Sequence, residues 1–174
     1  MKNTLLALLL LSISFSSCAQ MRIKREKAAQ DTAQQISTSG TSNAPAESSR
    51  RSIGVAQQFI RDLDNTNLAL DIVLSKHVLV QDADDEMYDY LMASLAEIRL
   101  NLQSKRLNEI RFVPYADMSR KDVADIDPEG MNTADMIFLY YGKRQLTALY
   151  VEKNKIASFT LVSKGNNRAH FVTY

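Results

Sequence analysis

The chain has 174 residues and carries 21 Lys and Arg against 20 Asp and Glu, so its net charge is only +1. Phosphate neutralisation needs a basic stripe, and none is visible in the sequence, so nucleic acid is not an expected partner. A single cysteine excludes an internal disulfide. With five glycines the chain has no phosphate-cradling loop or dinucleotide fingerprint, and no cofactor is expected.

The first residues have the pattern of an export signal. The basic residue Lys2 precedes an apolar run from Leu5 to Phe15. Such a run has the length of a signal core, whereas a helix that spans a membrane needs roughly 20 apolar residues. The sequence therefore predicts a signal peptide over residues 1–17, with an alternative end at residue 19.

The residues before the only cysteine suggest how the mature chain begins. Phe15, Ser16, Ser17 and Cys18 resemble the lipobox of bacterial lipoprotein precursors, in which small residues precede a cysteine that is lipidated after cleavage. The resemblance implies an acyl chain such as palmitate on Cys18 and an anchor in the bacterial cell envelope, in the periplasm or outer membrane. The alternative cut, after Ala19, would leave a secreted soluble protein.

Residues 18–52 have the composition of a polar tether. The stretch 21–52 is rich in Ser, Thr, Gln and Ala and has almost no large apolar side chains. It cannot bury enough apolar area to offset roughly 1 to 2 kcal/mol of backbone entropy per residue. Its net charge of +3 lies mainly near Cys18, where basic residues add about 1 kcal/mol each of attraction to anionic lipids, or simply keep a linker solvated.

Residues 53–174 have the composition of a single globular domain of 122 residues, with 14 Lys and Arg against 17 Asp and Glu. The domain opens with three helical patterns and closes with strands, an order that predicts an α+β fold with two or three N-terminal helices packed on a curved antiparallel meander. Ser52 is the expected cap of the first helix. The apolar positions of that helix fall on one face, namely Ile53, Ala56, Phe59, Ile60 and Leu63.

Two further helical patterns follow. The stretch from Leu68 to Val80 is apolar nearly all round, so we expect it to be buried on two sides, or to be extended in part. The next helix is the clearest, with Asp82 or Asp84 as its cap and acidic residues at its positive end. Its apolar stripe consists of Met87, Leu91, Leu95, Ile98 and Leu102.

After Leu107 the apolar periodicity changes to two. Residues 110–113 alternate as a strand, which Pro114 limits to an edge of the sheet or to an early end. Because short turns separate the later strands, we expect them to pair as an antiparallel meander. These strands are Asp135 to Tyr141, Leu146 to Glu152, Lys155 to Ser163 and Arg168 to Tyr174. The run 136–141 is apolar on both faces and needs cover on both sides.

The order of elements in residues 53–174 is similar to nuclear-transport-factor-like and cystatin-like folds. That resemblance implies a pocket between the sheet and the helices, which some relatives use for ligands or catalysis and others fill with side chains. No sequence motif of either family accompanies the order of elements.

The acidic segments are predicted to be structural. Asp125, Asp127 and Glu129 match the opening of a calcium loop, but the twelfth position, which needs a carboxylate, is Met136. We therefore expect a solvated acidic loop with a short helix capped by Ser119, and no metal site. The acids that begin the third helix are explained by the helix dipole.

Two functions from different classes are compatible with the sequence. The favoured one is a non-catalytic envelope module that presents its sheet to a protein, a peptide or a small apolar ligand. The alternative is an enzyme in which His77 or His170 works with a carboxylate such as Asp71 as general acid and base. The strand aromatics, among them Tyr140 and Tyr174, either line the core or form an exposed partner surface.

Overall fold

The computed structural model describes residues 44–81, 84–165 and 168–174. The chain divides after Ser39, and every described residue belongs to the unit 40–174. The predicted signal peptide, Cys18 and residues 18–43 of the predicted tether lie outside the described residues. None of the helices within the described ranges has both the length and the apolar character needed to cross a membrane.

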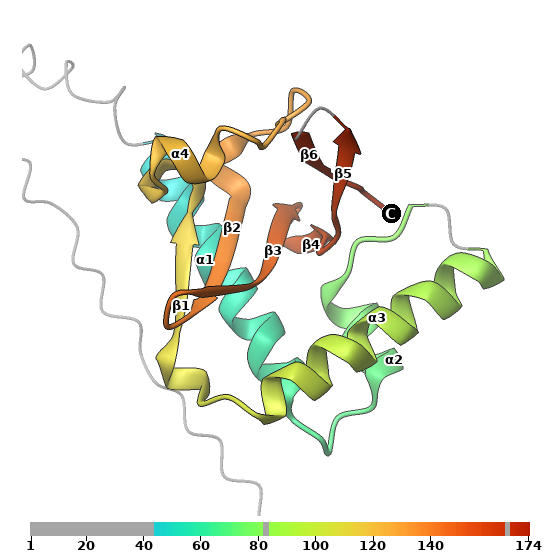
Figure 1. Cartoon of the computed structure of the whole chain (residues 1–174). Coiled ribbons are helices and arrows are strands. Elements are labelled where there is room, and N and C mark those ends of the chain that lie inside the picture. The colour runs from blue at the N-terminus through green and yellow to red at the C-terminus, as the bar shows by residue number, and fades with distance from the viewer. Residues whose placement is uncertain (1–43, 82–83, 166–167) are drawn as a thin grey trace, which may run out of the picture. The chain divides into compact units, whose positions relative to one another are not determined.

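The described unit is α+β, with helices first and an antiparallel sheet afterwards, as predicted (Figure 1). The helices are α1 (Ala44–Asp64), α2 (Leu70–His77), α3 (Asp85–Gln103) and the short α4 (Arg120–Val123). The strands are β1 (Ile110–Pro114), β2 (Met136–Tyr141), β3 (Arg144–Glu152), β4 (Lys155–Ser158), β5 (Leu161–Gly165) and β6 (Arg168–Phe171). Three single 3-10 turns, at 107–109, 115–117 and 133–135, connect them.

The first helix begins earlier than predicted. Ser52 does not cap α1 but lies inside it, and its hydroxyl donates to Asp135 Oδ1 at 2.6 Å. Ser48, one turn earlier, donates to the same oxygen at 2.7 Å. The predicted end of the tether at residue 52 is therefore wrong for residues 44–52. Polar contacts with the segment before β2 hold this part of the helix, and apolar periodicity gives no sign of them.

The third helix is confirmed, and the second is shorter than predicted. Asp84 caps α3 by accepting the Met87 N–H at 2.7 Å, and the predicted stripe supplies the buried side chains of this helix. The chain leaves α2 at Val78 and becomes extended. Burial of α2 on two sides is only partly correct, because Ile72 on its outer side is 46% exposed.

The four strands β1 to β4 form one antiparallel sheet in sequence order, as a meander should. The predicted strand from Lys155 to Ser163 is instead broken, and β5 pairs with β6 in a separate two-stranded sheet. The break has a local cause. The Ser158 hydroxyl accepts the Thr160 N–H and donates to the Thr160 carbonyl, both at 3.1 Å. These side-chain hydrogen bonds take the place of the backbone hydrogen bonds that would continue the strand.

Both faces of the sheet are covered, as the apolar run 136–141 requires. On one face Ile137, Leu139 and Leu149 pack with α1, α2 and α3 in the larger core cluster. On the other face Phe138 and Tyr150 pack with Phe171 of β6 in a smaller cluster. Figure 1 shows α1 crossing behind the sheet, with α4 and the β5–β6 pair on the near side. The helices therefore cover one face, and the loops and the second sheet cover the other.

Candidate functional site

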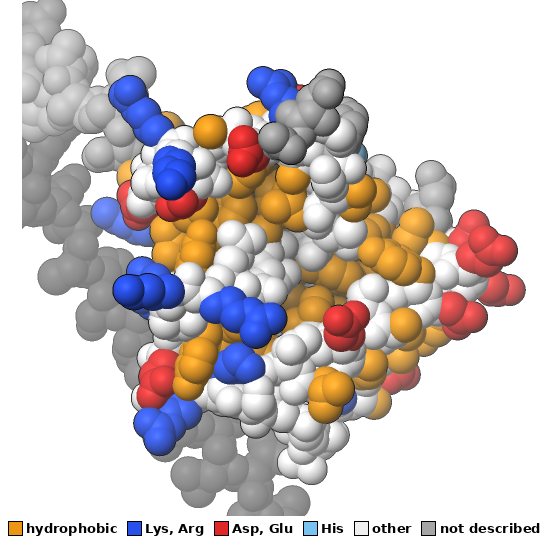
Figure 2. Space-filling model, viewed as in Figure 1, with side chains coloured by type: hydrophobic (Ala, Val, Ile, Leu, Met, Phe, Trp, Pro, Cys, Tyr) orange, Lys and Arg blue, Asp and Glu red, His pale blue; other side chains and the backbone are white. Residues whose placement is uncertain are grey.

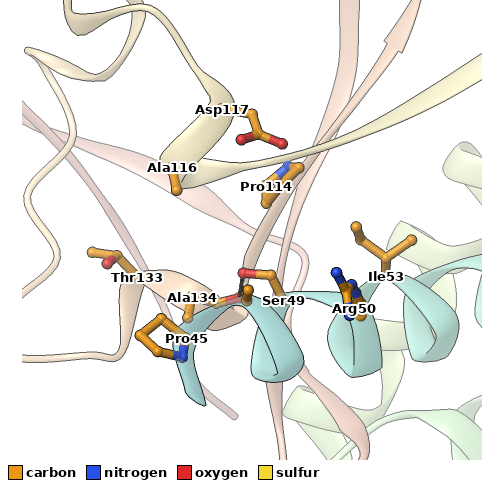
Figure 3. A pocket seen from close by; sticks show the side chains of 10 residues that line it. Pro45, Ser49, Arg50, Ile53, Pro114, Ala116, Asp117, Thr133 and Ala134 are labelled. Atoms are coloured by element: carbon orange, nitrogen blue, oxygen red, sulfur yellow. Dashed lines mark hydrogen bonds between the residues drawn. The ribbon is translucent and has the colours of Figure 1, made fainter. Parts of the chain in front are cut away.

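The described residues contain an open pocket at the N-terminal end of α1, with a volume of about 450 Å³. Ser49, Arg50 and Ile53 line it from the helix, and Pro114 and Asp117 line it from the end of β1 and the turn that follows. Figure 3 shows the helix and the end of β1 on opposite sides of this pocket.

A second pocket, of about 370 Å³, lies further along the same two elements. Gln57 and Arg61 line it from α1, and Ile110 and Phe112 line it from β1. The helical residues follow those of the first pocket at intervals of three or four, and the strand residues alternate with a period of two, so each set shares one face of its element. Because the two pockets follow the same faces of α1 and β1, we treat them together as the α1–β1 groove, defined by Arg50, Ile53, Gln57, Arg61, Ile110, Phe112 and Pro114.

Within the described residues, the side of β1 that faces away from β2 has no strand partner. Pro114 has no N–H, and the N–H of Ile110 donates to the Leu107 carbonyl, so neither residue donates to β2. In an antiparallel ladder, residues that bond to the partner strand alternate with residues that do not. The register of β1 against β2 is regular, so Phe112, like Ile110 and Pro114, is a residue whose backbone does not hydrogen-bond to β2. Its N–H and C=O therefore point outward, away from β2.

The charges around the α1–β1 groove are mainly positive. Arg50 and Arg61 line its two ends, and neither has an ion-pair partner within residues 44–81, 84–165 and 168–174; Arg61 donates to Gln58 Oε1 at 2.8 Å. Asp117 is the acidic side chain of the lining, at the Pro114 end. The Arg111 side chain does not block the outer edge of β1. It lies on the other face of the sheet, with its guanidinium 5.6 Å from the Tyr140 ring centroid.

A histidine and a carboxylate do meet elsewhere in the molecule. His77, only 7% exposed, lies with its Nε2 2.8 Å from Asp62 Oδ2, and Lys76 Nζ lies 2.6 Å from the same oxygen. The hydrogen bond from Lys76, and then that from His77, hold the pKa of the Asp62 carboxyl below its ordinary value. Neither His77 nor Asp62 lines either pocket of the groove, and the His77 ring packs 6.0 Å from Phe59. This hydrogen-bonded pair therefore packs against the helical core and lies outside the groove.

The other members of the alternative acid–base site lie apart from this pair. Asp71 is exposed in the first turn of α2, and His170 lies on β6 opposite Val162. No hydrogen bond or ring contact joins His77, His170 and Asp71 in the described part of the chain. The carboxylate that does meet His77 was missed because it lies on a different helix, and no spacing within one element could reveal it.

The acidic connection between β1 and β2 contains the predicted short helix. Ser119 caps α4 by accepting the Asp122 N–H, and Asp127 pairs with Arg168 of β6 at 3.2 Å. No group of three or more acidic, His or Cys side chains within the described ranges is arranged to hold a metal ion.

Most of the strand aromatics belong to the core. Tyr150 and Tyr174 are less than one tenth exposed, whereas Tyr140 and Tyr141 are partly buried. Burial raises the pKa of the Tyr174 hydroxyl. Figure 2 shows apolar side chains gathered in a hollow between α4 and the β5–β6 pair. Met118, Tyr140 and Leu161 pack against the smaller cluster and are only partly buried.

Comparison of the chain with family models, with curated proteins and with solved structures finds no match. The candidate site therefore depends on geometry alone.

Proposed function

We propose that this protein is an exported, lipid-anchored envelope protein whose folded unit is a non-catalytic binding module. The single observation that carries the proposal is the α1–β1 groove. It places two open pockets beside a strand edge that has no strand partner within the described residues, and those residues bring no histidine and carboxylate together in it. A site of this kind suits recognition, because apolar walls with a few polar groups provide affinity and orientation.

The anchoring part of the proposal is supported by the sequence. An apolar run from Leu5 to Phe15 followed by small residues and Cys18 is typical of exported lipoprotein precursors. Lipid on Cys18, together with the basic residues that follow it, would supply the two signals that stable membrane association needs. The binding unit would then be held close to the membrane surface by residues 18–43.

The anchor is tested by mass spectrometry of the mature N-terminus after expression of the full chain in a bacterial host. We expect Cys18 as the first residue, with a diacyl or triacyl mass and a membrane-bound protein. Cys18→Ala should abolish the added mass. A mature chain that begins at Gln20 without lipid, and that is recovered in the soluble fraction, would overturn the anchor and favour a secreted protein.

The groove is tested separately by photo-crosslinking in the same cells. A crosslinking amino acid is placed at Gln57, which is exposed and lines the groove, or at Gln103, which is exposed at the end of α3 and serves as the matched control. We expect a discrete adduct from position 57 and none from position 103. Equal adducts from both positions, or none from position 57, would contradict a binding role for the groove.

A further inference from the structure

We infer that the α1–β1 groove binds an extended peptide segment of a partner protein, which adds to the sheet as a strand beside β1 and carries acidic residues at its ends. This inference rests on the proposed function, because it names the class of partner for the same groove.

The backbone of β1 supports strand addition. The outward N–H and C=O of Phe112 are one donor and one acceptor on the same side of one residue, which is what an antiparallel neighbour uses when it exchanges two hydrogen bonds. The C=O groups of Ile110 and Pro114 face the same way by the same alternation. β1 has β2 as its sole strand partner in the described part of the sheet, so no described strand occupies the other side of β1.

The pockets supply places for the side chains of the added strand. A strand beside β1 would lie over the flank of α1, and every second side chain would point towards the helix. Those side chains would meet Ile53 and Gln57 on α1, which lie between the two arginines. Ile53 is part of the predicted apolar stripe and yet remains only partly buried, because it faces the groove. An apolar side chain from a partner would complete its burial.

The charges identify the ends of the segment. Arg50 and Arg61 are 11 positions apart on α1, and at about 1.5 Å per residue this separates them by roughly 16 Å. An extended chain covers that distance with about five residues at 3.3 Å each, so carboxylates at both ends of a short segment reach both guanidiniums. Asp117 opposes an acid at the Pro114 end, and the attraction is therefore strongest at Arg61.

A second copy of this chain fits the groove less well than such a peptide. The β1 strand of another copy would bring Arg111 and Pro114, of which one adds positive charge and the other removes an N–H. Charged residues and proline are the devices that protect sheet edges from self-association. The edge therefore disfavours its own copy and leaves the groove to an acidic partner.

The test uses wild-type protein from expression of the full chain and a fluorescein-labelled peptide of sequence Glu-Thr-Val-Thr-Val-Thr-Glu. The sequence is symmetric, so either strand direction presents Glu and Val side chains to the groove. Fluorescence anisotropy should show saturable binding. A peptide N-methylated at its third and fourth residues, which blocks either edge, should bind at least tenfold more weakly, and so should a peptide with Lys at both ends.

Two variants of α1 locate the binding. Arg61→Glu should weaken binding of the Glu-ended peptide about tenfold and improve binding of the Lys-ended one. The matched control is Arg51→Glu, which changes an exposed arginine of the same helix that does not line the groove and should alter binding less than twofold. Circular dichroism should show that both variants are folded.

Three results would overturn the inference. These are equal binding of the N-methylated peptide, equal loss in Arg61→Glu and Arg51→Glu, and absence of saturable binding of the Glu-ended peptide. If the protein forms a dimer without peptide, and Gln57→Arg dissociates that dimer, then the occupant of the groove is a second copy of this chain and not a peptide. Failure of the peptide together with a specific crosslink at position 57 would reject the partner class and leave the binding module in place.

Discussion

The two edges of the four-stranded sheet use their backbone groups differently. At the β4 edge, Val78 bridges to Ile156 and the Leu79 N–H donates to the Ile156 carbonyl at 2.8 Å, so the chain that leaves α2 closes that edge. At the β1 edge, the register places the Phe112 N–H and C=O on the side away from β2, and Phe112 lines the α1–β1 groove. The comparison indicates that the β4 edge contributes to the stability of the unit, whereas the outer side of β1 has no strand partner within the described residues, as the proposed strand addition requires.

We expect substitutions in the core on the side of the closed edge to lower the free energy of unfolding most, and Phe59 is the residue with the largest expected effect. Its side chain is fully buried in α1, and its ring lies 6.0 Å from His77 and 6.4 Å from Phe159. We expect Phe59→Ala to lower the free energy of unfolding by about 3 to 5 kcal/mol, because it leaves a cavity in the helical core. Urea denaturation followed by circular dichroism measures this change, and a loss below about 1 kcal/mol would mean that this side is not the core.

A smaller loss is expected at the ion pair of the same core. Asp62→Asn removes the charge that meets both His77 and Lys76 and should cost about 1 to 3 kcal/mol at neutral pH. Because the pKa of the Asp62 carboxyl is lowered in the folded chain, its stabilising effect is fully present above pH about 4 and is lost as the pH falls through the lowered pKa.

The pH dependence separates this account from a simple loss of packing. Urea midpoints of the wild type and of Asp62→Asn should converge as the pH falls below about 4. A difference between the two proteins that stays unchanged down to pH 2 would show that the carboxylate charge is not what stabilises the pair.

Tyr174 is expected to contribute less to the stability of the fold than Phe59 or Asp62. The Tyr174 hydroxyl accepts the Phe159 N–H at 3.1 Å and lies 2.7 Å from Thr160 Oγ1. Tyr174→Phe keeps the ring and leaves the buried Phe159 N–H without its partner, so we expect a cost of about 1 to 2 kcal/mol. Thermal denaturation checks it. A variant as stable as the wild type would show that this hydroxyl does not help to fix the break between β4 and β5.

Substitutions at the open β1 edge should hardly change the free energy of unfolding. Gln57 is exposed and lines the groove, and Gln57→Ala should change the free energy of unfolding by less than about 0.5 kcal/mol. The same urea titration as for Phe59→Ala gives the comparison within one helix. A cost above about 1 kcal/mol would show that the groove is part of the folded core rather than a surface for a partner.

Several elements of this fold could be predicted because their signals are local. The Asp84 cap and the regular apolar stripe specify α3, and Pro114 marks β1 as an edge strand, which is also the feature that points to the groove. The early start of α1 is also signalled locally by Pro45 and Glu47 in its first turn, a pattern typical of helix beginnings. The serine-rich composition of that segment obscured the signal.

Other features could not be predicted because they depend on contacts between distant segments. Asp62 meets His77 across two helices, and Ser52 meets Asp135 across most of the domain. The break between β4 and β5 depends on hydrogen bonds around Thr160 and on the docking of Tyr174. The groove itself exists only when α1 lies beside β1, so neither element reveals it alone.

Amide hydrogen exchange at Phe112, followed by NMR, tests the open edge most directly. The account predicts that the Phe112 amide exchanges much faster than the amides of the central strand β3 in the free protein, and that the Glu-ended peptide slows it. Exchange of the Phe112 amide as slow as that of β3 before any peptide is added would contradict the account, because it would show that this edge is already paired.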